Sequence, residues 1–130
     1  MSVVALYQMG ILKHVPELPS ARLDSDNITG SARAYSTLAT PDAILALGSY
    51  TITMTLAAMG AAERVKTDPI IPIALAAKVG FDAVIAAKYT VTEWREHRAL
   101  CSWCLLASAA VFASLPLVIP EARQALRNLR

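Results

Sequence analysis

Three long apolar stretches limit the folds open to this chain of 130 residues. They span 41–62, 69–90 and 99–119, and an α-helix needs about 20 predominantly apolar residues to cross the hydrocarbon core of a bilayer. The first stretch carries no charge beyond Asp42 and the third carries none, whereas the second holds three charged side chains. The stretches therefore predict three transmembrane helices.

The segments that precede them are different in kind. Residues 1–12 are apolar but too short to cross a membrane, and they lack the basic start and small-residue cleavage site of a signal peptide. They fit either the end of a truncated first helix or a short amphipathic helix lying on the bilayer. Residues 13–40 are rich in turn and cap formers, which predicts an outer loop. We expect a single membrane domain over 1–130: an all-α integral membrane helical bundle with three full transmembrane helices plus a partial first helix.

Composition supports this class and argues against several functions. Apolar residues make up 55% of the chain and charged residues 17%, whereas an average soluble domain is about 25% charged. A net charge of +2, with no basic stretch interleaved with aromatic residues, argues against nucleic acid binding. Two cysteines and two histidines argue against a closed metal site. The expected surroundings are membrane lipid, and the alternative is a soluble helical domain.

The two cysteines of the chain, Cys101 and Cys104, open the third apolar stretch. At this spacing on a helix they share a face and can form a disulfide. A helix N-terminus and nearby cations favour the reactive thiolate, and His97 and Arg98 lie just upstream. On a continuous helix, His97 would stack on Cys101. A thiol pair at a membrane surface indicates electron exchange between a protein disulfide and a quinone; the alternative is an inert pair that serves only packing.

Counting helices assigns the cysteines to one side of the membrane. The segments 13–40 and 91–98 are two crossings apart and share a side, which also holds the start of the third helix. Basic residues are denser in 63–68 and 121–130, on the opposite side. Because basic loops mark the cytoplasmic side, we expect the cysteine pair on the outer face.

Four further residues have both a structural and a functional interpretation. Lys78 and Asp82, four residues apart inside the second stretch, fit a mutual ion pair or a proton relay that serves quinone reduction. Asp42 fits an ordinary helix start or a group that bonds a ligand at the cysteine end of the bundle. Trp103, between the cysteines, fits interfacial packing or a contact with an aromatic ligand.

Two stretches of the sequence resemble the vitamin K epoxide reductase family in its bacterial branch. One is AKYTVTEWREHRALCSWCLLASAAVFASLPLVIPEA, in which the cysteine pair begins the last helix of a four-helix bundle. The other is SARAYSTLATPDAILALGSY, which resembles the family's loop-to-helix segment. The likeness covers about residues 5–122.

The resemblance implies a reaction and a setting. Cys104 would contact the quinone, a ubiquinone or menaquinone, and Cys101 would then close the disulfide. Asp42 and Ser108 fall at positions where family members bond the quinone. The protein would be a multi-pass protein of the bacterial inner membrane, with its cysteines on the periplasmic side, and would oxidise a thioredoxin-like periplasmic protein in support of disulfide bond formation.

The sequence also departs from the family pattern. Typical members carry a second cysteine pair in the outer loop, where this chain has Asp24, Ser25 and Asp26. A partner would therefore have to exchange directly with Cys101. The rival interpretation is a non-catalytic membrane subunit, or a degenerate paralogue, whose cysteine pair is structural. The short first helix would leave one wall of the quinone pocket open.

Overall fold

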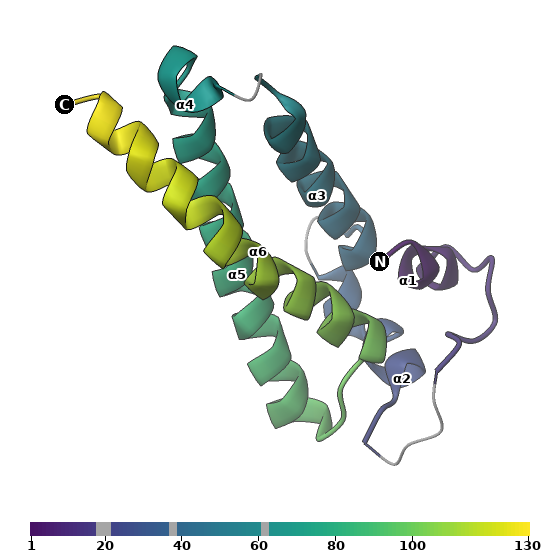
Figure 1. The fold of residues 1–130 in the computed structure, drawn as a ribbon. Helices are drawn as coiled ribbons and strands as arrows, with labels where there is room; N and C mark the ends of the chain where they lie inside the picture. The colour runs from purple at the N-terminus through teal and green to yellow at the C-terminus, as the bar shows by residue number, and fades with distance from the viewer. Residues whose placement is uncertain (18–21, 37–38, 61–62) are drawn as a thin grey trace.

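The computed structural model describes residues 1–17, 22–36, 39–60 and 63–130, and over these ranges the chain is helical. They contain no strand, only an isolated parallel bridge between Leu23 and Leu100. In chain order the elements are α1 (Ser2–Gln8), α2 (Ser25–Thr29), the 3₁₀ turn η1 (Ala32–Tyr35), α3 (Asp42–Ala58), α4 (Arg64–Thr67), α5 (Ile70–His97) and α6 (Ser102–Asn128). The three long helices, α3, α5 and α6, form the body of the molecule (Figure 1).

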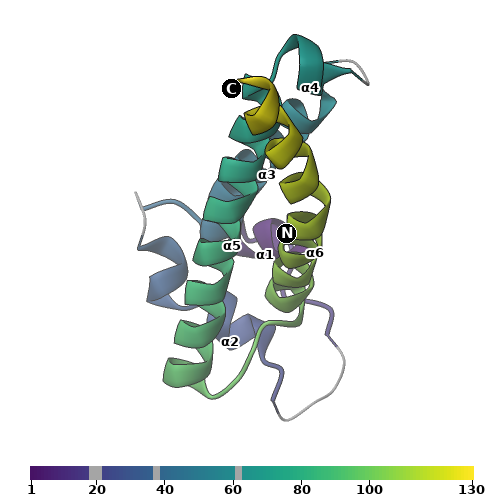
Figure 2. The same cartoon turned by 60° about the vertical axis from the view of Figure 1, so that its left-hand side comes forward.

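Helix α5 packs against both other long helices and is antiparallel to α6. The connection between α5 and α6 is tight because Arg98 ends α5 in the left-handed conformation, with φ of 52°. At the far end, the Arg64 guanidinium joins three elements. It donates to Glu121 of α6 and to the carbonyl oxygens of Ala57 and Met59 at the end of α3. Figure 2 shows α4 and the C-terminus together at this end.

Two of the three predicted spans are long and apolar enough to cross a membrane, namely α5 with 28 residues and α6 with 27. Helix α3 has 17 residues, which at 1.5 Å per residue gives about 26 Å, against about 30 Å of hydrocarbon. Three full spans are therefore not established. The last two residues of the expected span 41–62 lie outside the described residues.

Helix bounds also differ from the apolar bounds, because a helix does not end where its hydrophobicity ends. Helix α5 continues through polar residues to His97 instead of ending at 90, and α6 continues through Pro116 and Pro120 to Asn128 instead of ending at 119. At the N-terminus, α1 ends at Gln8, and Gly10 adopts a φ of 77° soon after it.

The long helices expose apolar side chains, as lipid contact requires. Ile52 and Met54 on α3, Phe81 on α5 and Leu106 and Leu117 on α6 are all more than half exposed. Within the protein, only 22% of the apolar window of α5 and none of that of α6 is buried. The core helices of a soluble protein would be mostly buried, so the exposure favours a membrane over the soluble alternative.

The main buried cluster lies at the cysteine end. It joins Val4 and Ala5 of α1, Ile28 of α2, Ala43 of α3 and Cys101. The outer loop is fixed across the start of α6, because the Leu100 N–H donates to the Arg22 carbonyl at 2.9 Å. The loop, the α5–α6 connection and the cysteine pair thus lie at one end of the bundle, as helix counting predicted.

Candidate active site

Cys101 and Cys104 lie at the start of α6 but occupy different surroundings. Cys101 is the N-cap residue and is completely buried, and its Sγ accepts a hydrogen bond from the Cys104 backbone N–H at 3.2 Å. Cys104 lies in the first turn and is partly exposed. Both are free thiols, and their side chains contact each other. The two sulfurs are therefore close enough to bridge.

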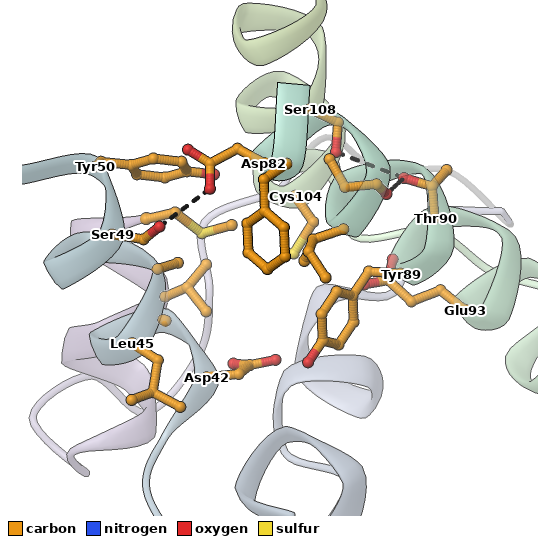
Figure 3. Close-up of a pocket in the computed structure, with 17 residues that line it drawn as sticks. Asp42, Leu45, Ser49, Tyr50, Asp82, Tyr89, Thr90, Glu93, Cys104 and Ser108 are labelled. Carbon is orange, nitrogen blue, oxygen red and sulfur yellow. Dashed lines mark hydrogen bonds between the residues drawn. The ribbon is translucent and has the colours of Figure 1, made fainter. Parts of the chain in front are cut away.

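A cavity of about 360 Å³ lies beside Cys104, between α1, α3, α5 and α6. Its walls are mainly apolar (Figure 3). The polar residues on its lining are Asp42, Ser49, Tyr50, Asp82, Tyr89, Thr90, Glu93 and Ser108. Cys104 lines this cavity, whereas Cys101 is packed in the buried cluster on the loop side. The volume and the mainly apolar walls are typical of a small-molecule site.

Asp42 is the first residue of α3 and lines the cavity at the cysteine end, so the two interpretations of its position are compatible. Gln8 of α1 orients it, because the Gln8 Nε2 donates to Asp42 Oδ1 at 2.7 Å and to the Thr29 carbonyl at 3.1 Å. The Gln8 Oε1 in turn accepts the Ala43 N–H at 3.2 Å. One amide side chain thus holds the start of α3 and directs its carboxylate.

Ser108 also lines the cavity, one turn beyond Cys104, and its hydroxyl lies 3.5 Å from that of Thr90 on α5. Trp103 lies outside the cavity. Its indole Nε1 donates to the Pro16 carbonyl at 2.9 Å and so fixes the outer loop to α6. The direction of this bond explains why Trp103, although it lies between the cysteines, does not reach the ligand space.

The expectation that His97 stacks on Cys101 is wrong. It required a continuous helix, whereas α5 ends at His97 and the chain reverses at Arg98 before α6 begins. His97 instead lines a small cavity of about 20 Å³, whose wall also includes Asp42 and Glu93.

Lys78 and Asp82 form the ion pair that their spacing predicted, with Nζ 2.5 Å from Oδ2. Two hydroxyls of α3 complete the cluster. The Ser49 hydroxyl accepts from Lys78 at 2.7 Å and donates to Asp82 at 3.1 Å, and the Thr53 hydroxyl donates to Asp82 at 3.3 Å. Because Ser49 and Asp82 line the cavity, this buried network forms part of its wall.

The geometry combines a thiol pair with an apolar cavity inside a helical bundle, and the comparison of sequences agrees with it. Residues 1–119 match the sequence model of the Vitamin K epoxide reductase family. The chain belongs to this family. Neither the curated proteins nor the solved structures contain a significant match. Membership in the vitamin K epoxide reductase family indicates oxidoreductase chemistry in a membrane, in agreement with the two long apolar helices.

In this member of the vitamin K epoxide reductase family, the loop region around Ser25 faces Cys101 with a hydroxyl. Ser25 is fully buried and its side chain contacts Cys101. The Glu17 carboxylate accepts the Ser25 N–H at 2.8 Å, the Ser25 hydroxyl at 2.7 Å and the Ser102 N–H at 3.3 Å. Burial alone would raise the pKa of Glu17, but these hydrogen bonds outweigh it and lower the pKa.

A second carboxylate holds the same loop. Asp26 accepts the Val15 N–H at 2.7 Å and contacts the His14 ring at 2.9 Å. The Val15 hydrogen bond is the main reason that the pKa of Asp26 is lowered; burial opposes the shift and His14 adds to it. The loop at the cysteine end is therefore pinned at two points by ionised carboxylates.

Sequence reasoning missed several residues of the site. Gln8 could have been noticed as the one strongly polar side chain of an apolar segment. Glu93 could have been noticed as a carboxylate one turn before the end of α5. Tyr50 and Tyr89 carried no signal that separates a cavity wall from ordinary packing, since aromatic residues are common in both.

Proposed function

We propose that the protein is a membrane thiol–disulfide oxidoreductase that transfers electrons from the Cys101/Cys104 pair to a quinone, either ubiquinone or menaquinone. The observation that carries the proposal is that the two sulfurs lie in different surroundings. Cys104 lines an apolar cavity among the membrane helices, whereas Cys101 lies beneath the outer loop. One sulfur thus faces the space for a lipid-soluble molecule and the other faces the water-exposed side.

The cavity suits a quinone ring in size and chemistry. Its volume of about 360 Å³ falls in the range of small-molecule sites. Asp42 and Ser108 are the proposed partners of the ring oxygens, and Tyr50 and Tyr89 are further hydroxyl donors on the cavity lining. Phe81 supplies an aromatic surface for the ring. The Lys78–Asp82 cluster forms part of the wall and is a candidate proton relay.

The reaction balances within these groups. Two thiols lose two electrons and two protons as one bond forms between the sulfurs of Cys101 and Cys104. The quinone gains both electrons and both protons and becomes a hydroquinone. Cys104 is the sulfur that contacts the ring, and Cys101 closes the disulfide. The N-cap position of Cys101 favours its thiolate, because the first backbone N–H groups of a helix stabilise negative charge.

Electrons have to reach the pair from another protein, since the chain has two cysteines in all. We propose a thioredoxin-like periplasmic protein that exchanges with Cys101, in a bacterial inner membrane with the cysteine end outward. The density of basic residues at the opposite end supports this orientation. Because Cys101 is completely buried, the loop that Glu17 and Trp103 hold in place would have to open for the exchange.

Quinone reduction by the purified protein tests the proposal. With a dithiol reductant and a soluble ubiquinone analogue, the wild-type protein should produce hydroquinone with multiple turnovers. Cys104→Ser should abolish the activity, and Ser114→Ala, on the same helix but away from this cavity, should retain it. Turnover by Cys104→Ser at the wild-type rate would refute the mechanism.

The rival function, a structural cysteine pair in a non-catalytic subunit, is motivated by the missing loop cysteines. It predicts a different reduction potential for the pair. A value far below about −300 mV marks an inert structural disulfide, whereas a higher value marks a labile, catalytic one. Titration of the pair against a dithiol redox buffer separates the two.

A further inference from the structure

Glu93 is a carboxylate of the cavity for which the reaction above has no use. It projects from α5 beside Tyr89 (Figure 3). It lines both the main cavity and the small cavity of about 20 Å³. Its side chain is half-buried, and its carboxylate lies near the Cys101 backbone N–H. It also interacts electrostatically with both cysteine side chains. Glu93 therefore shares the cavity lining with Cys104 and acts electrostatically on both thiols.

The other two carboxylates of the cavity have strong donors of their own. Asp42 accepts a hydrogen bond from Gln8 at 2.7 Å, and Asp82 is paired with the Lys78 ammonium at 2.5 Å. A carboxylate held by an ammonium is a poor proton acceptor because the ion pair stabilises its charged form. Glu93 is therefore better suited than Asp82 to accept and release a proton next to the sulfurs.

We propose that Glu93 carries the protons of the two thiols to the quinone oxygens, an inference that rests on the proposed function. The Glu93 carboxylate accepts the proton of Cys104 and delivers it to a ring oxygen. When the Cys101 sulfur bonds to that of Cys104, Glu93 accepts the second proton and delivers it in the same way. Glu93 ends ionised, as it began, and the two protons lost by the thiols are the two gained by the hydroquinone.

Other charged and titratable groups face the same space and bear on any pH dependence. On the main cavity they are the Met1 amino group, Asp42, Tyr50, Asp82, Tyr89 and Cys104, and on the small cavity Arg33 and His97. Of the cationic groups among them, Arg33 is paired with Glu96. These groups stay in place when Glu93 alone is changed, so a comparison of variants isolates its contribution.

The first test measures quinone reduction. Glu93→Gln keeps the shape of the side chain but cannot accept a proton. Because acid–base catalysis contributes about 10²–10⁴-fold, the maximal rate should fall by about that factor while the KM for the quinone changes little. Glu93→Asp should recover part of the rate. Glu63→Gln, an exposed carboxylate at the opposite end of the bundle, is the control and should keep the wild-type rate.

The second test needs no quinone and separates failure of this inference from failure of the proposed function. It follows the rate of iodoacetamide alkylation of the reduced pair against pH. Removing a neighbouring negative charge favours the thiolate, so the alkylation profile of Glu93→Gln should lie at lower pH than that of the wild type and of Glu63→Gln. Superimposable profiles would overturn the electrostatic interaction between Glu93 and the thiols.

The two tests together leave no ambiguous result. A shifted alkylation profile with a lowered maximal rate supports the proton carrier. A wild-type rate in Glu93→Gln overturns it. A shifted profile in a protein whose wild type reduces no quinone refutes the proposed function and, with it, the transfer to quinone. Loss of alkylation together with loss of turnover would mark a structural role for Glu93 and would also overturn the proposal.

Discussion

The Lys78–Asp82 pair offers a quantitative test of how the helices are held together inside the membrane. The two side chains are 18% and 11% exposed, and the pair is joined to α3 through Ser49 and Thr53. Lys78→Met removes the cation while keeping an unbranched side chain of similar length. Asp82 would then remain buried as a charge with only two hydroxyl donors.

The structure sets the size of the effect. Two unit charges 2.5 Å apart attract by roughly 7 kcal/mol at an effective dielectric constant of about 20. Removing both charges from water offsets much of this attraction. Removal of one partner from a buried pair nevertheless costs about 3–5 kcal/mol, because it leaves an uncompensated charge. We therefore expect Lys78→Met to lose free energy of unfolding in that range, and the double variant Lys78→Met/Asp82→Leu to regain most of it.

Unfolding in mixed detergent micelles, followed by circular dichroism, provides the free energies for a double-mutant cycle. The exposed pair Glu63–Lys66, with both side chains 72% exposed and 3.7 Å between the charged atoms, is the matched control and should contribute little. A single Lys78→Met variant as stable as the corresponding Lys66→Met variant would refute the reasoning. The reasoning would also be refuted if the losses of unfolding free energy in the two single variants added up to the loss in the double variant. Coupling between Lys78 and Asp82 predicts that they do not add up.

Two further predictions concern the cysteine end. Gln8→Leu leaves Asp42 and the Thr29 carbonyl without their donor, so it should cost about 1–3 kcal/mol of unfolding free energy, whereas Gln124→Leu, an exposed site on α6, should cost far less in the same assay. For Glu17, the folded pKa lies below its ordinary value of 4.5, so its contribution to stability is complete above that pH and is lost as the pH falls through the folded value. The protection of the Leu100 amide against hydrogen exchange, measured relative to the intrinsic rate at each pH, should accordingly fall below about pH 4.5 in the wild type and vary less over this range in Glu17→Gln; identical pH profiles of the protection would contradict the assigned role of Glu17.

Much of the architecture could be predicted from the sequence, because the patterns that indicate membrane helices involve residues close together in the chain. Apolar runs reveal buried or lipid-facing helices, and the spacing of Lys78 and Asp82 places both on one helix face. The position of Cys101 before an uncharged stretch also indicated a helix start. These features depend on neighbours within a few residues, which is the range that a single sequence describes well.

The features that the sequence did not predict depend on contacts between segments that are far apart in the chain. Gln8 bonds Asp42 across 34 positions, and Trp103 bonds Pro16 across 87. The reversal at Arg98, which separates His97 from Cys101, required a non-glycine residue in the left-handed conformation. No sequence periodicity predicts these contacts or this reversal, because packing at the cysteine end determines them. The residues that form the cavity wall could not be predicted from the sequence for the same reason.

Counting thiols in a single turnover tests the central claim, that the cysteine pair delivers its electrons to a quinone. The fully reduced protein is mixed without oxygen with one equivalent of a soluble quinone, and free thiols and hydroquinone are measured together. The account predicts two thiols lost for each hydroquinone formed in the wild type, and neither change in Cys104→Ser. Hydroquinone formed while both thiols persist, or thiols and quinone that remain unchanged together, would contradict it.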